Sequence, residues 1–152
     1  MIKHLLLLST ALGLAACGTT DKYEAVPTPI VADFDQEFTL NYRQQALLSA
    51  AIQPELTVEV TDIQYKLCPK DILCFTPNFV TPTLRVTDAQ GNTQQLKMSV
   101  NLERAYMPNW LDTTSVRANG RRYAFHYIKW EVDQMRDQPG KKDITVTFRV
   151  VK

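Results

Sequence analysis

The amino-acid sequence predicts an all-β protein whose main domain is an antiparallel β-sandwich of about seven short strands. In several segments apolar and polar residues alternate with a period of two, as they do in strands that bury one face. Turn sequences separate these segments, and no long segment has the 3.6-residue period of a helix. We expect an immunoglobulin-like architecture, with closure into a small barrel as the alternative.

The first half of the domain contains four expected strands. Phe38 and Leu40 alternate with polar residues in the first of them. Residues 44–51 fit either a strand or a helical turn before a proline, and we assign them to a strand. The same alternation predicts strands at 55–65 and 80–87.

The second half begins with a hairpin and ends with a closing strand. Residues 88–92 have the composition of a turn, in which Gly91 can take the positive φ that a hairpin bend needs. Clean alternation then predicts a strand at 96–102. Near the C-terminus, Pro139-Gly140 is a turn that leads into a strand at 144–151.

One strand of the second half is unusual because both of its faces are apolar. A long loop over 103–118 is expected to end at the turn Asn119-Gly120, which opens a strand at 121–132. Tyr123 lies on one face of this strand and Trp130 on the other. A bulge can shift the alternation partway, or the strand can be central and covered on both sides, and we favour the bulge. An exposed aromatic patch would instead be functional.

The N-terminus has the features of a signal peptide. Lys3 precedes an apolar stretch over 5–16, which is long enough for the apolar region of a signal peptide but too short to span a membrane. The stretch runs into Leu14-Ala15-Ala16-Cys17, which is a large apolar residue, two small residues and a cysteine. An ordinary secretory signal that happens to precede a cysteine is the alternative.

These four residues resemble the lipobox of bacterial lipoproteins. The resemblance implies cleavage before Cys17, diacylglycerol on the Cys17 thiol and acylation of the new amino group with a chain such as palmitate. Several acyl chains form an anchor that is close to permanent. In Gram-negative lipoproteins the residue after the cysteine influences sorting. Here it is Gly18 rather than the aspartate associated with the inner membrane, which favours the outer membrane.

Three parts of the chain are expected from these features. Residues 1–16 are the signal peptide, residues 17–35 are the lipidated N-terminus and a flexible tether, and residues 36–152 are the β-sandwich domain. In the tether, Pro27-Thr28-Pro29 favours an extended course.

Composition disfavours several classes of function. Once Lys3 is removed from the 17 Lys and Arg residues, 16 basic and 16 acidic side chains remain, and this balance argues against a nucleic-acid partner. His126 is the single histidine after the signal peptide, so a catalytic triad or a histidine-based zinc site has few candidates. There is no phosphate-binding glycine loop and no serine-nucleophile elbow, and we expect no cofactor, metal or catalytic residue.

Cys68 and Cys74 are the only cysteines besides Cys17. In an exported protein such a pair is expected to form a disulfide. Redox motifs place two residues between their cysteines, and two thiolates alone make a weak metal site. The segment from Cys68-Pro69 to Cys74, set between two strands, also resembles small β-sandwich lipoproteins of the bacterial envelope. That group has no settled activity, so the resemblance implies a fold and a location only.

Two apolar segments are candidates for contact with a partner. Phe75 and Phe79 lie in the connection that follows the second cysteine, and Tyr106, Met107 and Trp110 lie in the long loop. Aromatic residues and methionine are enriched at protein interfaces. Either segment can instead cap one end of the sandwich.

The expected function is therefore recognition without catalysis. We predict an outer-membrane lipoprotein, held by acyl chains, that is a binding module for another envelope component, with a protein as the expected partner. The alternative is a structural or assembly accessory of a secretion or surface complex, which a large apolar face on the strand at 121–132 would favour. A hydrolase is a third reading, disfavoured by the scarcity of histidine.

Overall fold

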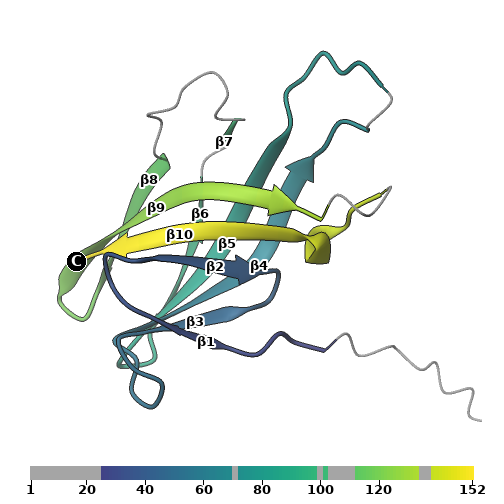
Figure 1. Ribbon diagram of the computed structural model, residues 1–152. Helices are drawn as coiled ribbons and strands as arrows, with labels where there is room; N and C mark the ends of the chain where they lie inside the picture. Colours follow the sequence, from purple (N-terminus) through teal and green to yellow (C-terminus); the bar gives the residue numbers. More distant parts are fainter. Residues whose placement is uncertain (1–24, 70–71, 99–100, 103–111, 134–137) are drawn as a thin grey trace, which may run out of the picture.

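The computed structural model describes residues 25–69, 72–98, 101–102, 112–133 and 138–152 (Figure 1). Two β-sheets face each other and form a β-sandwich. Within the described residues the helical content is one short 3₁₀ turn, Lys141–Asp143. The expected all-β fold is confirmed. The described residues form ten strand segments, more than the seven expected, because short edge segments add to the long central strands.

The larger sheet has the strand order β1-β3-β4-β5-β6, and β7 also pairs with β5. Its strands pair antiparallel except for β1 and β3, which run parallel. The strands are β1 (Ile30–Ala32), β3 (Gln45–Leu48), β4 (Leu56–Lys66), β5 (Phe79–Asp88), β6 (Thr93–Lys97) and β7 (Asn101–Leu102).

The smaller sheet has the order β2-β10-β9-β8, and all of its pairs are antiparallel. Its strands are β2 (Glu37–Asn41), β8 (Asp112–Ala118), β9 (Arg121–Val132) and β10 (Ile144–Val151). The long strands β9 and β10 lie at its centre, where both edges of each strand are hydrogen-bonded (Figure 1).

Three segments differ from the sequence-based expectation. β8 occupies the second half of the stretch that was expected to be a loop. β1 lies within the stretch assigned to the tether, so the packed domain begins before residue 36. The strand expected at 96–102 is divided, because β6 ends at Lys97 and β7 begins at Asn101, although both pair with β5.

The core lies between the two sheets and is made of the inward-facing residues of both. In β2 the exposed and buried residues alternate, as the sequence predicts, and Phe38 and Leu40 point inward. Each fully buried aliphatic or aromatic side chain contributes about 1.5–3 kcal/mol to folding. The largest completely buried side chains are Tyr123, Tyr127, Phe125, Phe148, Leu40, Leu48, Leu56, Ile63, Leu84, Met98, Ile144 and Val58.

A β-bulge explains why both faces of β9 are apolar. Tyr127 pairs with Phe148 of β10, while Lys129 pairs with the preceding Thr147, so Ile128 is an extra residue without a partner in β10. Tyr123, Phe125 and Tyr127 point into the core before this position, and Trp130 and Val132 pack against it afterwards, with Lys129 and Glu131 exposed. The predicted bulge is confirmed.

The two ends of the sandwich differ, and we name them by their connections. The turn end carries the β3–β4, β5–β6 and β8–β9 connections, and the C-terminus lies beside it (Figure 1). The disulfide end carries the connection from β4 to β5, residues 67–78, together with the 3₁₀ turn before β10.

Candidate binding surface

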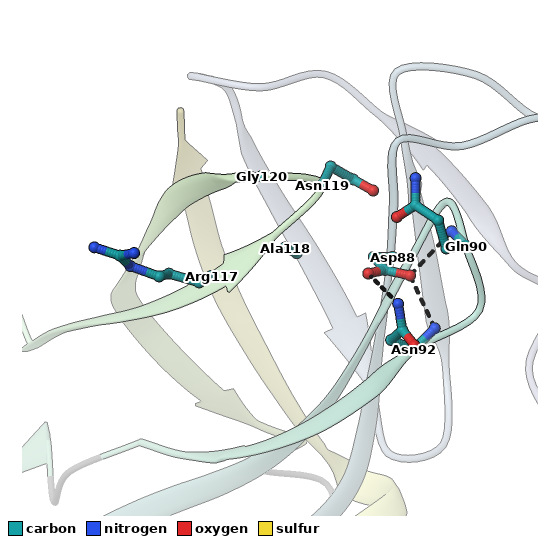
Figure 2. Close-up of a pocket in the computed structure, with 7 residues that line it drawn as sticks. All are labelled: Asp88, Gln90, Asn92, Arg117, Ala118, Asn119 and Gly120. Atoms are coloured by element: carbon teal, nitrogen blue, oxygen red, sulfur yellow. Dashed lines mark hydrogen bonds between the residues drawn. The ribbon is translucent and has the colours of Figure 1, made fainter.

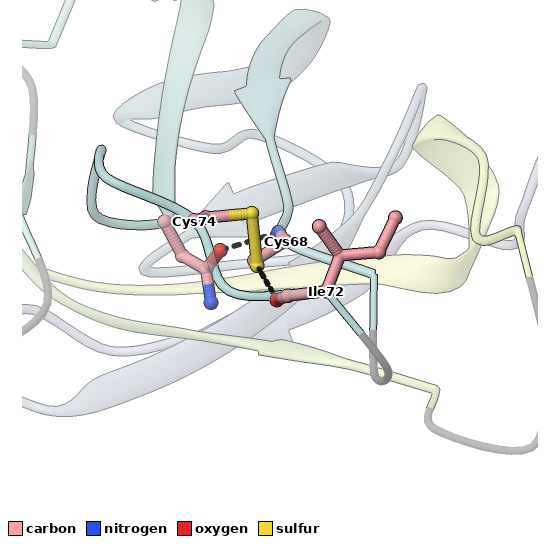
Figure 3. The surroundings of a disulfide bond; sticks show 4 residues. Cys68, Ile72 and Cys74 are labelled. Atoms are coloured by element: carbon pink, nitrogen blue, oxygen red, sulfur yellow. Dashed lines mark hydrogen bonds between the residues drawn. A yellow bond between two sulfur atoms is a disulfide. The ribbon is translucent and has the colours of Figure 1, made fainter.

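A disulfide between Cys68 and Cys74 closes the connection at the disulfide end (Figure 3). The two Cα atoms lie 5.9 Å apart, within the range that a disulfide spans without backbone movement. The predicted pairing is confirmed. Lys66 of β4 pairs with Phe79 of β5, so the disulfide closes a loop just beyond the last pair of the β4–β5 ladder.

Polar contacts add to the disulfide. The backbone N–H of Cys68 donates a 2.6 Å hydrogen bond to Oδ1 of Asn78, across the base of the loop. The Ile72 N–H donates to the carbonyl oxygen of Pro69, and Sγ of Cys68 lies 3.0 Å from the carbonyl oxygen of Ile72 (Figure 3). The loop is therefore tied at its base and within its ring.

Apolar side chains project from this loop into solvent. Phe75 is 98% exposed, Leu73 is 86% exposed and Ile72 is 61% exposed. The described residues hold six exposed large apolar side chains, and these three neighbours are half of them. A loop this small has no interior in which to bury them, so the disulfide presents them outward. We call Ile72, Leu73 and Phe75 the apolar tip.

The sequence-based candidates fall in different places. Phe75 belongs to the apolar tip, whereas Phe79 is half-buried as the first residue of β5 and pairs with Leu102 of β7. Tyr106, Met107 and Trp110 lie outside the described residues. Ile72 and Leu73 were not predicted as contact residues. Two large apolar residues inside a small disulfide ring are the signal that indicates them.

A second set of contacts joins the two sheets at the disulfide end. Lys141 donates a hydrogen bond to the Asp62 carboxylate of β4 and lies 5.7 Å from the centre of the Tyr42 ring. This hydrogen bond lowers the pKa of Asp62 and raises the pKa of Lys141. The hydroxyl of Tyr65 donates to the carbonyl oxygen of Pro139 at 3.1 Å. These bonds fix the 3₁₀ turn against β4.

The chain enters the domain at the same end. Ala25 and Pro27 line a small pocket of about 350 Å³ together with residues of the β2–β3 connection and the 3₁₀ turn: Asn41, Tyr42, Arg43 and Lys142. The buried side chain of Gln44 donates a 2.8 Å hydrogen bond to the carbonyl oxygen of Thr28. Its own carbonyl oxygen accepts from the backbone N–H of Asn41. Gln44 therefore fastens residues just before β1 to the sandwich.

The turn end has a polar pocket of about 430 Å³ that is open to solvent (Figure 2). Asp88 accepts hydrogen bonds from the backbone N–H groups of Gln90 and Asn92 and from the Asn92 side chain. The Asn92 side chain is the main cause of the lowered pKa of Asp88. Asn119 accepts from the N–H of Ala89 and so joins the two hairpins. The side chains of Asp88, Asn92 and Asn119 therefore hold the two turns together and are hydrogen-bonded within the protein.

His126, the single histidine that follows the expected signal peptide, lies in the smaller sheet. His126 is half-buried in β9, in register with Arg149 of β10 and Thr113 of β8. Within the described ranges, no three His, Cys, Asp or Glu side chains lie close enough to share a metal ion. The same ranges contain no helix with the length and apolar character needed to cross a bilayer.

No family model, curated protein or solved structure matches this chain. The geometry of the described residues and the N-terminal sequence are therefore what indicate a function for this chain.

Proposed function

We propose that this chain is a lipid-anchored protein of the cell envelope and a non-enzymatic binding module for another envelope component. The observation that carries the binding role is the apolar tip, in which Leu73 and Phe75 are almost fully exposed on a loop closed by a disulfide. A loop closed by a disulfide has fewer conformations to lose on binding than an open loop of the same length. Exposing neighbouring large apolar side chains costs solvation free energy, which contact with a partner recovers.

The anchor and the location are parts of the same proposal. They are supported by Leu14-Ala15-Ala16-Cys17, which resembles a lipobox, and by Gly18, which favours the outer membrane. An immunoglobulin-like architecture of the sandwich also belongs to the proposal and is supported by the mainly antiparallel two-sheet packing.

A permanently docked accessory role is less well supported. A large apolar face on β9 would favour that role, but Tyr123, Phe125 and Tyr127 point into the core and Trp130 packs against it. The exposed residues of the strand are the charged Arg121, Arg122, Lys129 and Glu131. Three of the six exposed large apolar side chains of the described residues lie instead in one small loop.

The anchor is tested by changing Cys17→Ser and following the protein through cell fractionation and mass spectrometry. The parent should carry acyl chains on Cys17 and no residues before it. The variant should lose the acyl mass and remain unprocessed or leave the membrane fraction. A variant that is processed and retained in membranes like the parent would contradict lipidation.

The binding role is tested by photo-crosslinking in intact cells. Benzoylphenylalanine replaces Phe75 in one chain and Ile52 in a control chain. Ile52 is 93% exposed but lies in the β3–β4 connection at the turn end. We expect adducts with an envelope component at position 75 and few at position 52. Equal yields at both positions, or none at either, would contradict a binding role for the apolar tip.

A further inference from the structure

The register of the larger sheet places the entry of the chain and the disulfide loop at one end. Ile30 of β1 pairs with Ala46 of β3, and Ala46 pairs with Val58 of β4. The chain before Ile30 leads back to residue 25. From Val58, β4 continues forward to Lys66 and the disulfide loop. Because β1 is antiparallel to β4 through β3, both directions lead away from the turn end; in Figure 1 the entering chain lies at the lower right and the loop after β4 at the upper right.

Side-chain contacts along this end agree with the register. Ala25 lies beside Tyr42 in the small pocket, Lys141 lies over the Tyr42 ring, and Lys141 binds Asp62 of β4. Asp62 is four residues before Lys66, where β4 ends and the disulfide loop starts. These contacts connect the entry point of the polypeptide with the half of β4 that leads into the loop.

The distance from the acyl anchor to this end is limited by the length of the polypeptide. Seven residues lie between Cys17 and Ala25, and the eight steps from one Cα atom to the next extend over at most about 28 Å. From the first to the last of its eleven residues, β4 alone rises by about 33 Å. Acyl chains on Cys17 would thus keep the disulfide end near the bilayer and the turn end farther from it. This step rests on the proposed lipidation.

We infer that the envelope component contacted by the apolar tip is the lipid bilayer that holds the acyl chains of Cys17. Ile72, Leu73 and Phe75 enter the boundary between the headgroups and the acyl chains, while the peptide groups of the loop stay at headgroup level. An aromatic ring and aliphatic side chains on a polar scaffold are the groups that partition into this boundary. The domain then stands on the membrane with the disulfide end down.

The surroundings of the tip fit lipid better than a protein surface. Lys66 at the end of β4 and Arg43 in the β2–β3 connection are exposed at this end, where they can approach lipid phosphates. A stable protein interface takes about 800 Å² from each partner, and three projecting side chains supply only part of that area. Bilayer insertion needs no complementary pocket and suits a small convex tip.

The inference is tested with the acylated full-length protein in vesicles of phosphatidylethanolamine and phosphatidylglycerol that contain lipids brominated on the acyl chains. Phe75→Trp reports on the tip, and Ile52→Trp is the matched control at the turn end. The signal of Trp110 and Trp130 is measured in the parent and subtracted. We expect the bromines to quench the Phe75→Trp variant several-fold more than the Ile52→Trp variant. Adding Leu73→Asp to Phe75→Trp should reduce the excess quenching roughly tenfold, since it removes an apolar side chain and adds a charge.

Each readout bears on a different proposal. Quenching of Phe75→Trp no stronger than that of Ile52→Trp would overturn the bilayer contact. Protein adducts in place of lipid adducts at position 75 in cells would also overturn it, while the binding role would stand. The acyl mass on Cys17 is measured separately on the same preparation, so failure of the anchor is recognised independently of the quenching.

Discussion

The hydroxyl of Tyr123 donates a 2.6 Å hydrogen bond to the carboxylate of Glu55, and this bond joins the two sheets at the turn end. Tyr123 is a fully buried residue of β9, and Glu55 immediately precedes β4. Lys152 lies 3.0 Å from the other carboxylate oxygen, and the Asn119 side chain donates to the Tyr123 hydroxyl. Burial and the bond to Glu55 raise the pKa of Tyr123. A charge-assisted network thus closes the sandwich opposite the disulfide.

Changing Tyr123→Phe should destabilise the domain by about 1.5–3 kcal/mol, because a hydrogen bond to a charged acceptor is lost while the ring still fills the core. The measurement is urea unfolding followed by circular dichroism. Tyr65→Phe is the matched control, since its hydroxyl bonds a neutral carbonyl oxygen at the other end. Tyr65→Phe should lower the free energy of unfolding by about 0.5–1.5 kcal/mol. A Tyr123→Phe variant no less stable than Tyr65→Phe would show that the Glu55 bond contributes little.

The same network makes stability depend on pH. The hydrogen bond from Tyr123 is the first cause of the lowered pKa of Glu55, followed by the contributions of Lys152 and Arg121. The unfolded glutamate has a pKa of about 4.3, so the unfolded state binds more protons below that value. The stabilisation is therefore present above about pH 4.3 and is lost as the pH falls through the lower folded-state pKa.

We expect Glu55→Gln to be less stable than the parent at neutral pH and to lose less stability on acidification. Urea unfolding at a series of pH values from 7 to 3 measures both effects. Asp62 and Asp88 also have lowered pKa values, so some acid sensitivity should persist in the variant. Parallel curves for parent and variant across this range would exclude a contribution from Glu55.

The strands that alternation identified are those that bury one full face. β9 was predicted with the same bounds, and its bulge followed from aromatic residues on both faces. β8 was missed because its sequence, DTTSVRA, has only Val116 and Ala118 as buried apolar residues. β1 was missed because three residues are too few to show a period and because its pairing with β3 is a tertiary contact. Such pairings cannot be read from local sequence.

The candidate surface was predicted in part. The cysteine pair and Phe75 were found from spacing and composition, since both depend on local chemistry. The partial burial of Phe79 depends on β5 beginning at that residue and pairing with Leu102, which is distant in sequence. The register of β1, β3 and β4 leads both the entering chain and the disulfide loop away from the turn end. This relationship could be recognised only in the folded structure.

The disulfide should contribute stability to the domain and order to the apolar tip. By the loop-entropy estimate, closing a ring of about seven residues contributes roughly 2 kcal/mol. The Cys68→Ser, Cys74→Ser double variant should therefore unfold at a lower urea concentration than the oxidised parent. Reduction should bring the parent close to the variant and leave the variant unchanged. The double variant should also lose part of the bilayer quenching of Phe75→Trp, because Ile72, Leu73 and Phe75 would then have to be ordered on binding. Equal stability with and without reductant, together with alkylation of both cysteines in the unreduced exported protein, would show that the bond does not form in the envelope.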